Sequence, residues 1–205
     1  MTALPVLCFM NKRIDKISEL IKNESIGIIP TDTIYGLVGS AFSKVAVERI
    51  YKVKKRDSRK PLIVLICEYK DIRNFSVKIS TSEEKILKKI WPGKISVILP
   101  IVGNKYQYLH RGTGEIAFRI PKSKLIRNIL KKTGPLVAPS ANPENLSPAE
   151  SVKKAREYFG NEIDFYLGGK TGNKPSTLIR FNENKVEILR EGAISKSLAA
   201  RLTKK

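Results

Sequence analysis

Short apolar runs alternate along this chain with longer stretches in which apolar residues recur at helical spacing. The periodic stretches predict helices through Ile14 and Ile21, from Val45 to Val53 and from Thr81 to Trp91. The runs predict buried strands, and an Asn-rich turn should join the last two of them into an antiparallel hairpin. The strands are expected at residues 26–30, 62–66, 95–99, 115–120, 135–138, 163–167, 177–181 and 185–189. The pattern therefore predicts an α/β fold with a mixed sheet and flanking helices.

Local signals refine the ends of two helices. Thr81 and Glu84 have the spacing of a capping box, and Pro92 with Gly93 should end the helix that follows. The segment 147–150 reads Ser-Pro-Ala-Glu, which is typical of a helix start with Ser as the cap and Pro at the first position. No repeat and no Gly/Ser-rich linker interrupts the chain, so residues 1–205 are expected to form a single domain.

The chain is strongly basic. Lys and Arg number 39 against 19 acidic residues, which gives a net charge of +20. Such a charge attracts polyanions such as RNA, or phosphorylated small molecules. Because the lysines are spread through the whole chain, ordinary solvated surface charge explains the excess equally well. Residues 51–60 have the same two explanations, binding of an anion or solvated surface charge, because seven of the ten residues are charged and six of these are basic.

Histidine and cysteine are too few for several kinds of site. His110 is the only histidine, and its polar neighbours predict an exposed position. Cys8 and Cys67 lie far apart and are expected to be buried thiols in a reducing cytosol. These counts exclude a His-based catalytic triad and a transition-metal site made of His and Cys. The apolar runs are too short to span a membrane, so a cytoplasmic protein is expected.

Polar residues follow two of the predicted strands. Thr31, Asp32 and Thr33 come directly after strand 26–30, and the segment Pro-Ser-Ala-Asn at 139–142 follows strand 135–138. Side chains at strand ends line ligand pockets in many α/β proteins, although ordinary turns use the same residue types. Taken alone, each segment is explained at least as well by a turn.

Residues 54–60 connect a predicted helix to strand 62–66. Lys54 and Arg56 lie at the helix C-terminus, where basic residues favour the helix dipole without any ligand. The loop must nevertheless return to the sheet, which brings Arg56 and Lys60 towards its edge. There they could form a cradle for a phosphate or carboxylate group.

Six short motifs occur in one order along nearly the whole chain, and together they resemble the YrdC-like threonylcarbamoyl-adenylate synthases. That resemblance implies a twisted mixed sheet with flanking helices around a deep, positively charged cavity. The motifs are PTDTIYGL at 30–37, the KxR of 54–56 with KPL at 60–62, AFRIP at 117–121, PSAN at 139–142, PST at 175–177 and ILREGAIS at 188–195.

The resemblance also implies an activity. Enzymes of this family condense L-threonine, bicarbonate and ATP into threonylcarbamoyl-AMP and release pyrophosphate. Mg²⁺ is expected on the triphosphate, without metal ligands from the protein. A separate transferase complex then modifies tRNA at the adenosine next to the anticodon. A direct contact with tRNA or other RNA through the basic surface is a further expectation.

The motifs carry specific site residues with them. Lys54 and Arg56 are expected to be the catalytic pair, at the ATP phosphates and the developing carbamate. The residues expected to bind L-threonine are Thr33, Arg119, Ser140 and Ser176. The residues expected to bind ATP are Arg56, Lys60, Asn142, Ser147 and Arg190.

The chain departs from the family pattern in places. Glu115 stands where the family commonly has Ser or Thr, and Leu65 stands where many members have His. The chain also ends soon after the last motif, so the single-domain kind of synthase, without a covering linker, is expected.

Two other functions remain open at this level. One is a non-catalytic RNA-binding or ribosome-maturation protein of the same fold, although aromatic residues for base stacking are sparse among the basic ones. The other is carbamoyl adenylation like that of the YrdC-type domains in hydrogenase-maturation proteins, whose chains are much larger and carry further segments.

Overall fold

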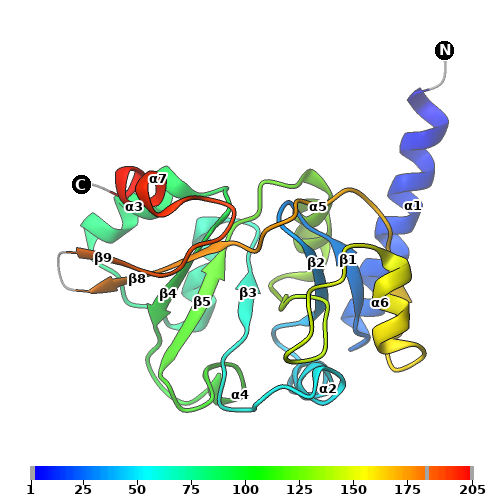
Figure 1. Cartoon of the computed structure of the whole chain (residues 1–205), viewed down its shortest axis with the longest axis horizontal. Helices are drawn as coiled ribbons and strands as arrows, with labels where there is room; N and C mark the ends of the chain where they lie inside the picture. Colours follow the sequence, from blue (N-terminus) through cyan, green and yellow to red (C-terminus); the bar gives the residue numbers. More distant parts are fainter. Residues whose placement is uncertain (1–2, 183–184, 204–205) are drawn as a thin grey trace.

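The strands of the described residues, nine in number, form a single mixed sheet that organises the fold (Figure 1). The computed structural model describes residues 3–182 and 185–203, and for residues 3–10 the backbone alone. The strands are β1 (Gly27–Pro30), β2 (Tyr35–Ser40), β3 (Ile63–Leu65), β4 (Ile95–Pro100), β5 (Glu115–Arg119), β6 (Leu136–Val137), β7 (Phe165–Tyr166), β8 (Thr177–Asn182) and β9 (Lys185–Arg190). The helices are α1 (Ala3–Lys22), α2 (Lys44–Lys54), α3 (Thr81–Ile90), α4 (Gln107–His110), α5 (Lys124–Thr133), α6 (Val152–Phe159), α7 (Lys196–Leu202) and the 3-10 helix η1 (Tyr69–Phe75).

Parallel and antiparallel pairs alternate irregularly across the sheet, whose order is β7-β1-β2-β6-β3-β5-β4-β8-β9. β3 pairs with β5, β1 with β7 and β4 with β8 in parallel, while the remaining neighbours are antiparallel. β8 and β9 form the hairpin expected from the Asn-rich turn. The prediction of an α/β fold with a mixed sheet and flanking helices is therefore confirmed.

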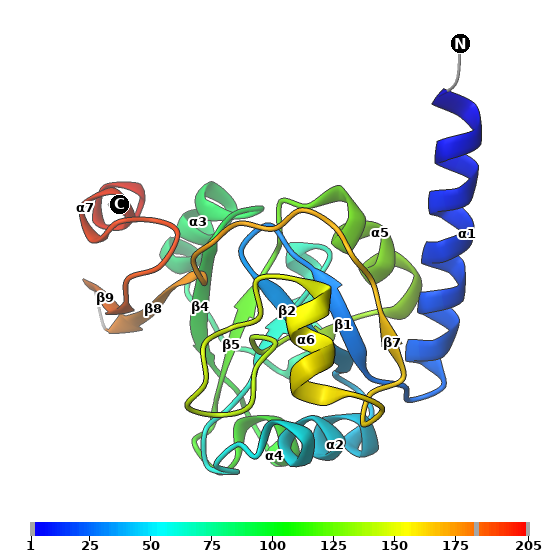
Figure 2. The same ribbon diagram turned by 45° about the vertical axis from the view of Figure 1, so that its right-hand side comes forward.

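Alternating side chains divide the sheet between two cores. On β1, Ile28 belongs to one core and Ile29 to the other, as the two-residue period of a strand requires. The larger core packs α2, α3 and α6 against the sheet. The smaller core packs α1 and α5 against β1, β2, β6 and the end of β3, and Figure 2 shows these two helices side by side.

The second face of the sheet is only half covered by helices. Ile63 and Leu65 of β3 contribute to the core under α1 and α5 and also line a pocket that continues along the same face. Beyond them, Ala117 of β5 and Ile98 of β4 lie opposite each other and face that pocket. The fold therefore leaves an open floor over β3, β5, β4 and β8.

Two predicted helix starts were wrong in detail. The capping box of α3 is formed by Ser80 and Glu83, one residue before the expected Thr81 and Glu84. The predicted start at Ser147 is not helical, and α6 begins after the cap Ser151. Residues 147–150 are held elsewhere, because the Ala149 N–H donates to the carbonyl oxygen of Ala141 over 2.9 Å. This tertiary contact overrides the local signal.

Two predictions about single residues also meet the structure. His110 is buried rather than exposed, because its Nδ1 accepts hydrogen bonds from the N–H groups of Gly112 and Gly114, each over 3.2 Å. Cys67 is buried, as expected. The side chain of Cys8 lies outside the described part of the structure.

Strand β2 and helix α5 were not predicted at all.

Candidate active site

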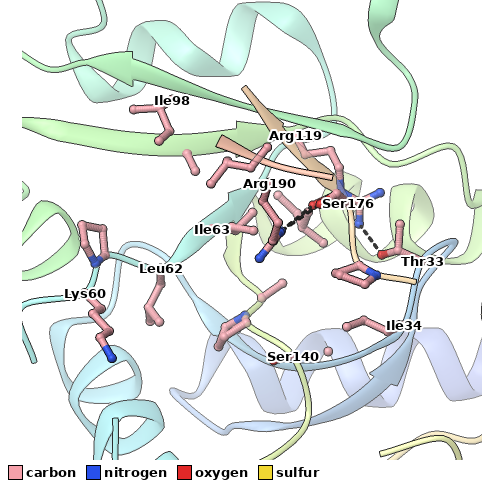
Figure 3. A pocket seen from close by; sticks show the side chains of 18 of the residues that line it. Thr33, Ile34, Lys60, Leu62, Ile63, Ile98, Arg119, Ser140, Ser176 and Arg190 are labelled. Atoms are coloured by element: carbon pink, nitrogen blue, oxygen red, sulfur yellow. Dashed lines mark hydrogen bonds between the residues drawn. The ribbon is translucent and has the colours of Figure 1, made fainter. Parts of the chain in front are cut away.

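A pocket of about 520 Å³ occupies the open half of the sheet (Figure 3), a size usual for small-molecule sites. Its floor comes from β3, β4, β5 and β8, and its walls come from the β1–β2 turn, the loop before β3, the segment after β6 and strand β9. Of the ten residues expected at the site, seven line it: Thr33, Arg56, Lys60, Arg119, Ser140, Ser176 and Arg190.

One end of the pocket is built around a buried arginine. Arg119 is the last residue of β5, and its Nη1 donates to Asp32 Oδ1 over 2.7 Å. Its Nη2 lies 3.4 Å from Thr33 Oγ1, which also exchanges a hydrogen bond with Thr31 Oγ1 at 2.9 Å. Arg119 is 3% exposed and Thr33 is 4% exposed. Their polar groups are thus fixed before any ligand arrives, in a position to hold a carboxylate and a hydroxyl.

Ser176 lies beside this end, at the start of β8. Its hydroxyl exchanges a hydrogen bond with Ser96 Oγ at 2.8 Å, and its carbonyl oxygen accepts from Arg190 Nη2 at 2.9 Å. Figure 3 shows Arg190 and Ser176 reaching the centre of the pocket, with Ser140 on the opposite wall. β9 therefore brings the guanidinium group of Arg190 next to Ser176, at the end of the pocket that holds Arg119 and Thr33.

Of the residues that the structure describes, six with basic side chains line the pocket, and four of these have acidic partners. Arg119 pairs with Asp32, and Lys60 pairs with Glu144. The other two pairs are Arg59 with Asp57 and Arg180 with Glu115. Among the described residues, no carboxylate pairs with Arg56 or Arg190. These two guanidinium groups are therefore the lining cations whose charge is not offset by a carboxylate of the described residues.

Arg56 and Arg190 lie close enough to influence each other. Partial removal from water lowers the pKa of Arg190, and the positive charge of Arg56 lowers it further. Arg56 is held in place by carbonyl oxygens, since Nε donates to Lys60 and Nη2 donates to Pro61, each over 3.2 Å. Two neighbouring cations without acidic partners favour an anion between them.

Lys54 does not line the pocket. It ends α2 with 1% of its surface exposed, and its Nζ donates to the carbonyl oxygens of Ser140, over 2.6 Å, and Asn142, over 2.5 Å. Burial, with a smaller contribution from Arg56, lowers its pKa from 10.5 to about 7. Lys55, in the left-handed conformation, then turns the chain so that Arg56 faces the pocket instead. The side chains of Lys54 and Arg56, the two ends of the KxR motif, thus point in different directions.

Glu144 joins the two loops that carry these motifs. Its carboxylate accepts from Lys60 Nζ over 2.5 Å and from the Asp57 N–H over 2.6 Å. Its own N–H donates to the carbonyl oxygen of Lys54 over 2.7 Å. With Lys54, these contacts tie residues 54–60 to residues 140–146.

Asn142 and Ser147 also lie outside the pocket lining. Asn142 Nδ2 donates to the carbonyl oxygens of Pro143 and Leu146, so it shapes its own loop. Ser147 is exposed, while the next residue, Pro148, does line the pocket. The loop therefore reaches the site, but by different residues from those expected.

Sequence reasoning missed several lining residues. Arg59, Thr113 and Arg180 were not singled out, Thr31 was named only as part of a polar segment that a turn explains at least as well, and Glu115 was noted only as a departure. Glu115 could have been found from its spacing, because positions four apart on a strand share a face and Arg119 was already assigned. Arg180 required knowing that β8 lies beside β4.

The polar groups of the described residues that line the pocket are mainly cations, hydroxyls and main-chain groups, with one carboxylate from Glu115. In the described part of the chain, no three His, Cys, Asp or Glu side chains gather closely enough to hold a metal ion. Within the same residues, no helix combines the length and hydrophobicity needed to span a bilayer. The arrangement is suited to binding and orienting two anionic groups side by side.

Comparison with known proteins finds relatives that match most of the chain. The family model Sua5_yciO_yrdC, described as "Telomere recombination", matches residues 19–192. The threonylcarbamoyl-AMP synthase of Bacillus subtilis is 29% identical over 90% of this chain, and the chain spans about half of that relative (54%). The threonylcarbamoyl-AMP synthase of Marinobacter nauticus is 30% identical over 73% of this chain and 81% of its own length.

A solved structure shows the same fold. Sua5 of Pyrococcus abyssi, complexed with L-threonine, superposes with a TM-score of 0.86 at 26% sequence identity. The match covers 92% of this chain and 56% of that protein.

Proposed function

The chain belongs to the Sua5/YciO/YrdC family, and we propose that it is an L-threonylcarbamoyladenylate synthase. It would use L-threonine, bicarbonate and ATP to make threonylcarbamoyl-AMP, with release of pyrophosphate. Residues 1–205 would act as one catalytic domain. The names of the relatives and the L-threonine bound to the Pyrococcus protein support this proposal.

The observation that carries the proposal is the pair of guanidinium groups, Arg56 and Arg190, that lack acidic partners among the described residues. They stand beside an end of the pocket whose hydrogen-bonding groups suit an amino acid. Threonine carbamate and ATP are both anions, so bringing them together costs Coulomb repulsion. Fixed cations between them offset that repulsion in both the ground state and the transition state.

The reaction itself requires positioning more than proton transfer. Bicarbonate and the threonine amine condense with loss of water to a carbamate, whose oxygen attacks the α-phosphorus of ATP. The bond from this phosphorus to the bridging oxygen breaks, and pyrophosphate leaves with the electron pair. Because the carbamate is already an anionic nucleophile, no strong side-chain base is needed, and the orientation of the two substrates supplies much of the acceleration.

Each end of the pocket would hold one substrate. Arg119 would bind the threonine carboxylate, while Thr33, Ser140 and Ser176 would surround its amine and hydroxyl. Arg56 is the proposed catalytic residue at the carbamate and α-phosphate.

The nucleotide side would be completed by the loops. Lys60 and Arg190 would contact the ATP phosphates. We assign Lys54 and Asn142 to the support of the 140–146 loop, since their side chains bind its carbonyl oxygens. Ser147 would approach ATP beside Pro148.

Further features belong to the same proposal. Mg²⁺ would enter with ATP as part of the substrate, bound by the triphosphate. The product would pass to a transferase complex that modifies tRNA, with action in the cytoplasm. A contact with tRNA through the basic surface also remains a proposal.

One assay tests this function against its alternatives. Pyrophosphate release from ATP and bicarbonate should depend on L-threonine. Release that requires carbamoyl phosphate instead would indicate the hydrogenase-maturation type of reaction. No release, together with tight RNA binding, would indicate the non-catalytic alternative, which the relatives do not favour.

A further inference from the structure

An ion pair closes the end of the pocket opposite Arg119. Glu115 Oε2 accepts from Arg180 Nη2 over 2.7 Å, and both side chains line the pocket. The pair spans strand β4, where Ile98 lies opposite Ala117 on one side and Arg180 on the other. Within residues 3–182 and 185–203, Glu115 is the one acidic residue that lines the pocket.

The pair is far from the threonine end. Glu115 and Arg119 are the first and last residues of β5, so strand geometry separates them by about 13 Å. Between these two ends lie Arg56 and Arg190, the lining cations for which the described residues supply no carboxylate partner. A molecule whose middle is anionic could place that part at Arg56 and Arg190 and its uncharged end at Glu115.

The pair contributes little to the fold. The side chains of Arg180 and Glu115 are 38% and 32% exposed, and ion pairs this open to water contribute about 0–1 kcal/mol. A carboxylate would also repel a triphosphate placed next to it. Its position therefore indicates that the phosphates lie towards Arg56 and that the nucleoside lies towards Glu115.

The surroundings of Glu115 are suited to a nucleoside. Leu62, Ile98 and Leu178 give the pocket apolar surface for a flat base, and Figure 3 shows Leu62 and Ile98 on the side away from Thr33. An ionised carboxylate can only accept hydrogen bonds. Arg180 occupies Oε2, and Oε1 has no hydrogen-bond partner among the described residues.

We propose that Glu115, oriented by Arg180, determines nucleotide specificity by accepting a hydrogen bond from an N–H or O–H donor of the nucleoside of ATP. The inference rests on the proposed function and deepens it. The donor is either the 6-amino group of the base or a ribose hydroxyl. A nucleotide that lacks this donor leaves a carboxylate oxygen unpaired, and sites built around such a bond discriminate strongly.

The test measures binding without turnover. Calorimetric titrations with Mg²⁺, but without L-threonine, compare ATP with its 2′-deoxy analogue, its 3′-deoxy analogue and purine riboside triphosphate, which lacks the 6-amino group. The wild type should bind one of these about tenfold or more weakly than ATP, and the analogue identifies the donor. Glu115→Ala should bind that analogue and ATP within about threefold of each other.

Controls separate this inference from general damage and from the proposed function. Glu157→Ala removes an exposed ion pair with Lys154 on α6, away from the pocket, and should keep the wild-type discrimination. Glu115→Thr, checked by thermal denaturation, should lose it like Glu115→Ala. Equal discrimination in the wild type and both Glu115 variants, or none in the wild type, overturns the inference alone. A wild-type protein that binds no ATP overturns the proposed function as well.

Discussion

The ammonium nitrogen of Lys54 lies 2.6 Å from the main-chain carbonyl oxygen of Ser140, although 86 residues separate them along the chain. The first residue of the KxR motif therefore binds the backbone of the PSAN motif. Lys54 does not line the pocket itself, and it acts on the site by holding in place the loop on which Ser140 lines the pocket.

Replacing Lys54 should destabilise the protein. In Lys54→Met the carbonyl oxygens of Ser140 and Asn142 lose their donor in a buried position, which should lower the free energy of unfolding by about 1–3 kcal/mol. Urea denaturation measures the change. Lys52→Met, an exposed position on the same helix, is the control and should stay within about 0.5 kcal/mol of the wild type. Equal midpoints for the two variants would contradict this role.

Lys54 should also give stability a pH dependence. Its pKa falls from 10.5 to about 7 in the folded protein, so between these values the unfolded chain binds the extra proton. The free energy of unfolding should therefore gain a contribution from Lys54 that rises as the pH increases from about 7 to about 10. A neutral amine still has two hydrogens for its two carbonyl partners. Denaturation curves at several pH values, for wild type and Lys54→Met, isolate this slope, and identical slopes would refute it.

Arg56→Ala should abolish threonine-dependent pyrophosphate release while the fold survives. The variant loses one of the two cations without acidic partners, which we place at the carbamate and α-phosphate. A loss of at least about 100-fold in kcat/KM is expected, comparable to the removal of one electrostatic contact in other transition states. Lys52→Ala, which removes an exposed charge from α2, should keep normal turnover. Near-normal turnover in Arg56→Ala would eliminate its catalytic role.

Thr33 should affect the amino acid substrate selectively. Thr33→Val keeps the shape but removes the hydroxyl that meets Arg119 and Thr31. The KM for L-threonine should rise about tenfold or more, because a hydrogen bond within a charged network is lost. The KM for ATP should change little. Thr33→Ser keeps the hydroxyl and should retain most of the affinity for L-threonine. If both variants instead raise the KM for ATP equally, Thr33 does not act at the amino acid end of the pocket.

Much of the sheet could be predicted because its central strands carry apolar side chains on both faces, one packed in a core and the other forming the pocket floor. Residues 63–65 and 95–99 read as unbroken or nearly unbroken apolar runs for this reason. β2 was missed because Gly36 and Gly39 interrupt its pattern. Gly39 has no room for a side chain without shifts, since an added Cβ would lie 3.0 Å from Ile26. A tightly packed strand therefore resembled a turn.

The site was only partly predictable, because the sequence locates a residue but does not show in which direction its side chain points. Motif strings located the lining segments, and seven expected residues line the pocket. They could not show that the helix end at Lys54 points inward to carbonyl oxygens while Arg56 points to the pocket. Nor could they show that Ala149 binds Ala141 and so prevents a helix from starting at Ser147.

The pocket has walls from positions as early as Thr31 and as late as Arg190, because β8 and β9 complete the sheet beside β4. During synthesis on the ribosome, Thr33 and Arg119 emerge well before Ser176 and Arg190 can join them. A nascent chain would thus lack a complete pocket until β9 had been made. Under the proposed function, ATP and L-threonine would therefore stabilise the chain only after that point, and would not guide its earlier folding during translation.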